Sequence, residues 1–161
     1  MKIFSLFIVS LFGCMSLFAQ EKGFVIKGRI PGMPDGVEVS LLAAEKDLLG
    51  GESSILVETT VKNGYFELRG KLDAPLLCTL ITNNQMLHLK DTSCQIKWTY
   101  TPLFVENVEI AIKADDYDSV TSETPFIVEG GEAQRDYVEY QRLKEERRRG
   151  ESAEWEFILS H

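Results

Sequence analysis

The chain has 161 residues, of which 44% are hydrophobic and 26% are charged, and its formal net charge is −8 at pH 7. This composition is typical of a globular protein and excludes the collagen-like and intrinsically disordered classes. Because like charges repel, the acidic balance disfavours nucleic acid and anionic lipid as partners. The length is sufficient for one domain with its own core.

The first 19 residues have the pattern of a secretory signal peptide. Lys2 provides a positive start, the apolar run Ile3–Phe18 is broken only by Ser, Gly and Cys, and Ala19 is a small residue suited to cleavage. The run is shorter than the ~20 apolar residues that a membrane span requires. We therefore expect residues 1–19 to be removed on export to the periplasm.

Cys14 leaves a second fate open for the exported chain. The segment Leu11–Cys14 resembles a lipoprotein signal, in which Cys14 would be lipidated and would anchor the chain to the membrane. However, Phe12 stands where such signals carry a small residue, and the apolar run continues beyond Cys14. The sequence therefore favours the cleaved periplasmic form and keeps lipidation at Cys14 as the alternative.

Residues 22–131 predict a β domain, because short runs of alternating apolar and polar residues are separated by turn residues. Between two of these runs, Asn63-Gly64 is the dipeptide that best fits a type I′ hairpin turn. We expect an antiparallel β-sandwich or open barrel in which about seven or eight short strands meander. The predicted strands are 24–30, 37–41, 55–61, 65–69, 76–82, 86–90, 94–100 and 108–112, with a short last strand at 126–128.

The composition changes at Glu132, where the β pattern gives way to a helical one. Ala133, Tyr137 and Tyr140 share one face at helical spacing, which predicts a helix over 132–149 that ends at Gly150. Residues 150–161 are predicted to form a tail. Its apolar side chains have nothing within the tail to pack on, so we predict that they contact a partner: Trp155, Phe157, Ile158 and Leu159.

Cys78 and Cys94 are the thiols that follow the predicted signal peptide, and export would place them where disulfides persist. In a simple meander the two residues lie two strands apart, about 10 Å, which exceeds the ~7 Å limit between the Cα atoms of a disulfide. Two free thiols are favoured, and a Cys78–Cys94 disulfide remains the alternative. Neither cysteine has the Cys-x-x-Cys neighbour that thiol exchange uses.

The residue pattern predicts no catalytic, cofactor-binding or metal site. His88 is expected on the polar side of the strand 86–90, so no hydrolase base is indicated. The acidic segment that includes Asp116 and Asp118 approaches a calcium loop, but Val120 occupies a ligand position and Thr121 replaces the required glycine. We therefore expect a protein that is not an enzyme and has no cofactor.

Six strand and turn motifs follow one another in a characteristic order: Phe24–Ile30, Val37–Leu42, Lys62–Gly70, Ala74–Leu77, Leu103–Ile110 and Phe126–Gly130. Their order resembles one particular family over residues 22–145. In that family, a domain of unknown function precedes the thioredoxin-like domain of periplasmic thiol:disulfide interchange proteins of the ResA and TlpA type. The Trp-Cys-x-x-Cys motif of the longer relatives is missing here, so the resemblance assigns their redox activity to no residue of this chain.

The resemblance implies a non-catalytic, exported accessory or interaction domain associated with thiol-disulfide systems of the cell envelope. Its partner would be an envelope protein or peptide. Two alternatives stay open. The chain could be a truncated remnant of a longer thioredoxin-like oxidoreductase, or a β-sandwich that binds a small ligand in a cavity lined by Trp98, Tyr100 and Phe104.

Overall fold

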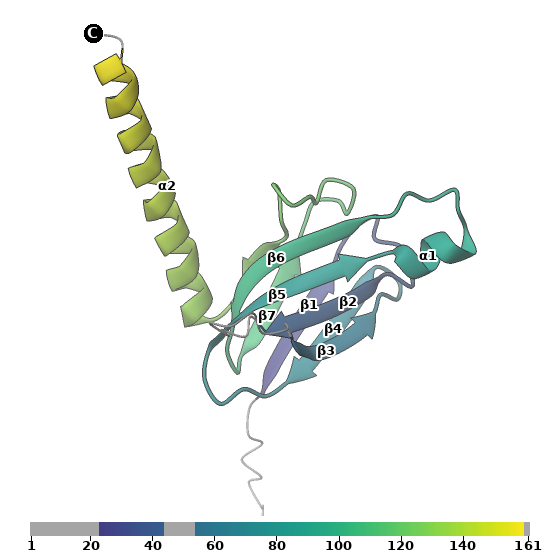
Figure 1. The fold of residues 1–161 in the computed structure, drawn as a ribbon. Coiled ribbons are helices and arrows are strands. Elements are labelled where there is room, and N and C mark those ends of the chain that lie inside the picture. The colour runs from purple at the N-terminus through teal and green to yellow at the C-terminus, as the bar shows by residue number, and fades with distance from the viewer. Residues whose placement is uncertain (1–22, 44–53, 160–161) are drawn as a thin grey trace, which may run out of the picture.

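The computed structural model describes the backbone of residues 23–43 and 54–159, and the side chains as far as residue 149 (Figure 1). The predicted signal peptide and Cys14 lie outside the described residues, as do the side chains of Trp155, Phe157, Ile158 and Leu159. The elements are β1 (Phe24–Arg29), β2 (Glu38–Ala43), β3 (Ser54–Thr60), β4 (Tyr65–Gly70), β5 (Leu76–Asn83), α1 (Gln85–Lys90), β6 (Trp98–Val105), β7 (Glu109–Lys113), β8 (Ile127–Glu129) and α2 (Glu132–Leu159).

The strands form two four-stranded sheets that pack face to face, with the order β4-β1-β7-β8 in sheet A and β3-β2-β5-β6 in sheet B. This arrangement confirms the prediction of a mainly β, sandwich-like fold with a C-terminal helix. The simple meander was wrong, because β1 pairs in parallel with β7 while the chain between them passes through sheet B. Within residues 23–43 and 54–159, no helix combines the length and apolar character needed to cross a membrane.

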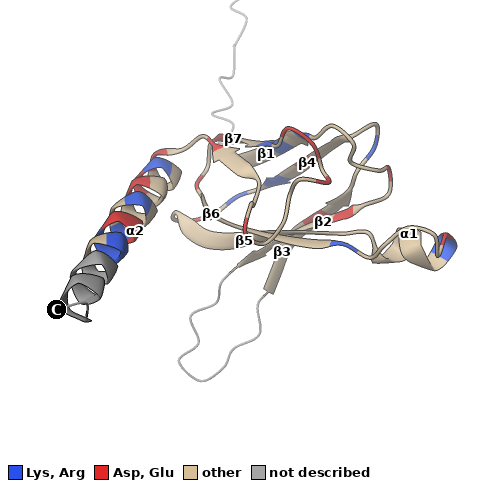
Figure 2. Cartoon of the chain, turned by 90° about the horizontal axis from the view of Figure 1, so that it is seen from above, with Lys and Arg blue, Asp and Glu red and all other residues tan. Residues whose placement is uncertain are grey.

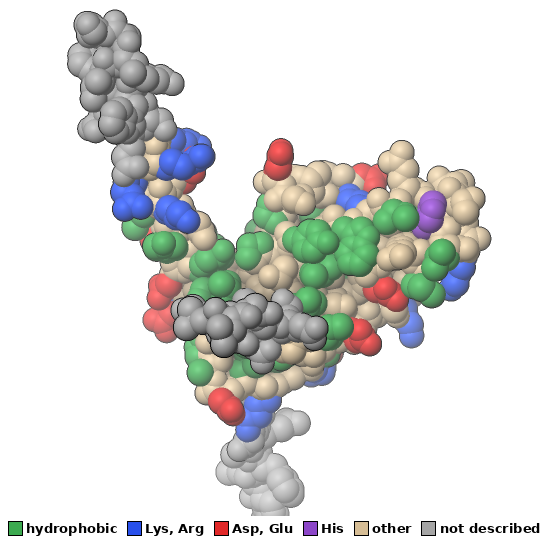
Figure 3. All heavy atoms as spheres, in the orientation of Figure 1, with side chains coloured by type: hydrophobic (Ala, Val, Ile, Leu, Met, Phe, Trp, Pro, Cys, Tyr) green, Lys and Arg blue, Asp and Glu red, His purple; other side chains and the backbone are tan. Residues whose placement is uncertain are grey.

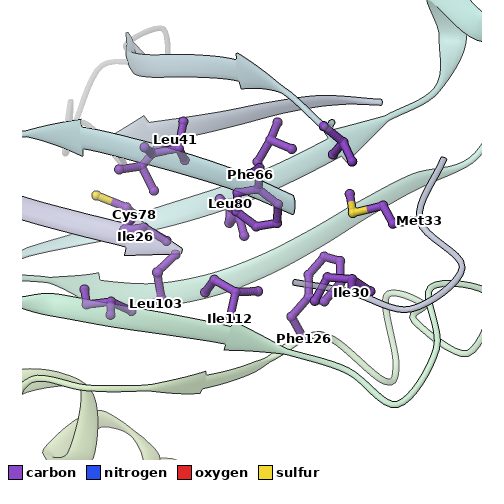
Figure 4. Close-up of a cluster of buried hydrophobic side chains, with 14 of the residues drawn as sticks. Ile26, Ile30, Met33, Leu41, Phe66, Cys78, Leu80, Leu103, Ile112 and Phe126 are labelled. Atoms are coloured by element: carbon purple, nitrogen blue, oxygen red, sulfur yellow. The ribbon is translucent and has the colours of Figure 1, made fainter. Parts of the chain in front are cut away.

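The core fills the space between the two sheets, because every second residue of each long strand points inward (Figure 4). The burial of β1 alternates strictly, with Phe24 and Ile26 inside and Val25 and Lys27 partly exposed. Each buried aliphatic or aromatic side chain stabilises the fold by roughly 1.5–3 kcal/mol. The largest fully buried side chains include Ile26, Leu41, Phe66, Leu68, Leu80, Leu103, Ile110 and Ile112.

The predicted hairpin at Asn63-Gly64 is right in its turn and wrong in its pairing. Asn63 and Gly64 have φ values of 53° and 66°, the left-handed angles that a type I′ turn requires. However, β3 pairs with β2, β4 pairs with β1, and a single bridge between Lys62 and Tyr65 joins the two sides of the turn. The turn is therefore a corner at which the chain passes from one sheet to the other.

The strand predicted at 86–90 is the helix α1, and Asn84 explains why. The backbone carbonyl of Asn84 accepts hydrogen bonds from the N–H groups of Leu87 and His88, at 2.9 and 3.0 Å, which starts a helical turn. Its side chain bonds to the backbone of Gln95 and Lys97, at 2.8 and 2.7 Å, and so closes the connection to β6. The strand expected at 94–100 accordingly begins later, at Trp98, and continues to Val105.

Helix α2 begins at Glu132 as predicted, but it does not end at Gly150. It continues to Leu159, so most of the predicted tail is helical. The carboxylate of Glu106 accepts hydrogen bonds from the backbone N–H groups of Glu132 and Ala133 and caps the first turn from another segment of the chain. A glycine inside a helix costs only about 1 kcal/mol relative to alanine, which the good helix formers on both sides of Gly150 offset.

Gly28 tests the packing of the core. A Cβ atom at this position would lie 2.3 Å from a ring carbon of Phe66, which stands opposite Gly28 in the β1–β4 ladder. We expect Gly28→Ala to destabilise the protein by about 1–3 kcal/mol through overpacking, measured by urea unfolding. Gly150→Ala is the matched control, because nothing lies within 4 Å of a Cβ atom there. Equal unfolding midpoints for the two variants would contradict the packing described.

Candidate functional site

The outer face of sheet A is a solvated surface held by ion pairs. Lys27 pairs with Glu109 at 2.7 Å, and Lys113 pairs with Glu129 at 2.5 Å. The Tyr65 hydroxyl donates to Glu67 at 2.7 Å, and this bond, followed by the one from Arg69, lowers the pKa of the Glu67 carboxyl. Such a surface interacts well with water and offers little apolar area to a partner.

The outer face of sheet B is different, because apolar side chains dominate it. In the described part of the chain, its four strands contain no lysine or arginine, and Figure 3 shows hydrophobic side chains gathered over β5 and β6. The strand registers place the outward-facing residues of neighbouring strands side by side. We call the following set the apolar face: Leu42, Ile55, Leu77, Ile81, Trp98, Tyr100, Pro102 and Phe104.

Two aromatic rings form the most prominent part of the apolar face. Trp98 and Tyr100 are 42% and 45% exposed, and their rings are nearly parallel, with an angle of 13° and centroids 6.5 Å apart. Tyr100 stands opposite Ile81 of β5 in the ladder. Exposed aromatic residues often supply much of the binding energy of protein interfaces, so this pair is a candidate contact site.

Helix α2 covers one end of the apolar face. The rings of Phe104 and Tyr137 lie 5.4 Å apart at an angle of 59°, and the side chain of Gln134 accepts a hydrogen bond from the backbone N–H of Phe104 at 2.7 Å. A shallow groove of about 530 Å³ runs between the helix and the sandwich, with Pro102, Ile127 and Val138 among its lining residues. The contact leaves Trp98 and Tyr100, nearer the start of β6, open to solvent.

Cys78 and Cys94 are both free thiols, so the alternative of a disulfide between them is not realised. Cys78 points from β5 into the core, where burial raises the pKa of its thiol to about 11. Cys94 lies between α1 and β6, and its thiol donates to the carbonyl of Asp91. In the predicted meander Cys94 would lie on a strand, level with Cys78. Because α1 replaces the expected strand, Cys94 lies in the connection before β6 instead.

The polar residues singled out in the sequence serve local structure. His88 lies on α1 rather than on a strand, and its Nδ1 is 2.6 Å from the carbonyl oxygen of Cys94. The Asp116 carboxylate accepts a hydrogen bond from the backbone N–H of Asp118 at 2.8 Å, which forms a turn of its own. No group of three or more potential metal ligands occurs among the residues that the structure describes.

The alternative of a ligand cavity between the sheets requires aromatic side chains of β6 to point inward, and they do not. Trp98, Tyr100 and Phe104 project from the outer face of β6, while Leu103 and Val105 fill the interior. The sequence does carry a signal that the outer face of sheet B is apolar. The run Leu76–Ile81 is apolar at both parities except for one threonine, and such runs are typical of strands that are covered on both faces.

The thiols provide a direct test of these environments. At pH 8 a thiol with a pKa near 11 is about 0.1% ionised, and Cys78 is also buried, whereas Cys94 is partly exposed. We therefore expect native protein to be alkylated at Cys94 and not at Cys78, as read by peptide mass mapping. Denatured protein should react at both. Labelling of native Cys78 at the rate of Cys94 would contradict its burial.

A family model described as a domain of unknown function (DUF4369) matches residues 24–137. This range runs from the first residue of β1 to Tyr137 of α2 and so includes the whole sandwich. No curated protein and no solved structure matches the chain.

Proposed function

The chain belongs to the family of domains of unknown function DUF4369, and on that premise we propose that it is a non-catalytic accessory domain that binds a protein partner through its apolar face. One observation carries the proposal. The two outer faces of the same sandwich differ, since sheet A carries ion pairs and sheet B carries exposed aliphatic and aromatic side chains. Apolar patches of this kind on soluble domains mark interaction sites.

The titratable side chains support a binding role rather than a reaction. The Cys78 thiol is buried and has a raised pKa, which keeps it protonated and unreactive at neutral pH. His88 is engaged with the backbone of Cys94, and Asp116 is engaged with its own turn. These groups lie on different elements and serve the fold, so we assign them no chemistry.

We propose that the partner is a thioredoxin-like protein of the cell envelope. This part of the proposal rests on the sequence resemblance to domains that precede a thioredoxin-like domain, and on the signal-peptide pattern of residues 1–19. The charged residues within the four strands of sheet B are acidic, namely Glu38 of β2 and Glu58 of β3. A partner surface that combines apolar contact area with lysine or arginine would complement them.

Substitution of Tyr100 tests the docking surface. We expect Tyr100→Glu to weaken binding to a purified periplasmic thioredoxin-like protein from the same organism by about 2 kcal/mol, or roughly thirtyfold, because it places a charge at the centre of an apolar contact. Isothermal titration calorimetry measures the change. Tyr65→Glu is the matched control, since it makes the same substitution on the outer face of sheet A. Equal affinities for the two variants, or no binding by the wild type, would refute the proposed surface or partner.

The proposed lack of redox activity can be measured separately. We expect the purified protein to reduce the disulfides of insulin no faster than the buffer with dithiothreitol alone, because its two thiols in the described region are free and lie on separate elements. A thioredoxin at equal concentration serves as the positive control. Acceleration of insulin precipitation would show that the domain is an oxidoreductase in its own right.

A further inference from the structure

Helix α2 is an arm that extends well past its contacts with the sandwich (Figures 1 and 2). Its 28 residues span about 42 Å at 1.5 Å per residue. The contacts with the sandwich come from its first turns, which include Gln134 and Tyr137. Lysine, arginine, aspartate and glutamate alternate along the described part of the arm, as Figure 2 shows.

The side of α2 that faces away from the groove carries apolar side chains without a cover among the described residues. Tyr140 and Leu143 are 59% and 51% exposed. Together with Lys144 and Arg147 they line a surface depression of about 240 Å³. The spacing of these residues, i, i+3, i+4 and i+7, is that of the four-residue hole that receives a side chain from a second helix in coiled-coil packing.

The sequence of α2 is complementary to itself when two copies run antiparallel. Placing Tyr140 of one copy opposite Leu143 of the other fixes the register of the whole pair. The same register sets Asp136 opposite Arg147 and Ala133 opposite Gly150. Each layer then joins opposite charges, apolar side chains or two small residues, whereas a parallel pair would set Asp136 against Asp136 and Arg147 against Arg147.

The residues that flank this seam do not oppose the pairing. Arg142 forms ion pairs with both Glu139 and Glu146 of its own helix, each at 2.6 Å, so the two carboxylates that border the seam are neutralised within each copy. Arg148 and Arg149 are likewise engaged with Glu145, at 2.9 and 3.1 Å. The charges of these flanking residues are therefore balanced within each copy.

From these observations we infer that α2 pairs antiparallel with α2 of a second copy of this chain. In this register, residue 151 of one helix lies opposite residue 132 of the other. The last eight residues of each helix therefore extend about 12 Å past the start of its partner, toward the partner's sandwich. Their sequence includes Trp155, Phe157, Ile158 and Leu159, the residues predicted to contact a partner.

This pairing goes beyond the proposed function and does not depend on it, because α2 and the exposed aromatic pair of the apolar face are separate surfaces. Sedimentation-velocity ultracentrifugation of the exported protein over a concentration series tests it. We expect the wild type to shift from monomer to dimer as the concentration rises, and Leu143→Glu to raise the dissociation constant at least about tenfold. Val138→Glu is the control. It changes a residue of similar exposure, 54%, on the groove side of the helix, and should associate like the wild type.

Charge reversal distinguishes the proposed pairing from a general effect of substitution. Asp136→Arg and Arg147→Asp should each be monomeric alone, since each sets like charges opposite one another. An equimolar mixture of the two variants should form dimers again, and so should the double variant. The double variant also reports orientation, because a parallel pair would keep like charges together in it. A wild type that stays monomeric throughout, or a mixture and a double variant that fail to associate, would overturn the inference.

Discussion

Packing of the two inner sheet faces against each other determines which residues of every strand remain outside. Because side chains alternate along a strand, the inward orientation of Cys78 and Leu80 forces Leu77 and Ile81 outward on the same strand. A shift of one residue would exchange the two sets. In sheet A the set left outside is charged and is satisfied by ion pairs across neighbouring strands. In sheet B the set left outside is apolar, and the fold contains nothing beyond the first turns of α2 to cover it in the described region.

The free edge of β6 shows how the chain protects the sandwich while leaving that face open. Pro102 lies in the middle of this edge strand, where its missing N–H costs no ladder bond. The backbone N–H of Phe104 is occupied by the side chain of Gln134, which is itself buried. Both devices discourage another strand from adding to the edge. Addition of a strand at the β6 edge is thereby disfavoured.

Most of the fold could be predicted from the sequence because alternation and turn residues are local signals. The strands β1, β4 and β5 and the start of α2 follow directly from them. The failures arise where a distant contact decides the structure. Residues 86–90 form a helix because Asn84 is held by Gln95 and Lys97, and the alternation within so short a segment cannot report that distant contact. The pairing of β1 with β7 joins segments about eighty residues apart, which no local pattern specifies.

The apolar face could not be predicted from the sequence for a related reason. The sequence placed Trp98 and Tyr100 inside the fold, as core residues or, in the alternative of a ligand-binding sandwich, as the lining of a cavity, because aromatic residues in a strand are most often buried. Their parity in β6 opposes that of Leu103 and Val105, so only one set can face the core. The strand carries apolar residues at both parities, and the sequence alone does not say which set is covered by the second sheet.

The two surfaces have a joint consequence if both proposals hold. An antiparallel helix pair would carry one sandwich at each end, since each α2 begins at its own sandwich and extends past the other copy's first turn. The assembly would then present two apolar faces to one partner assembly. Linked sites raise the effective concentration of the second binding event, so a face of modest affinity can give firm attachment without any new contact. A partner with paired binding sites would therefore be retained far more strongly than a monomeric one, and separation of the helices would release it without any change to the apolar face itself.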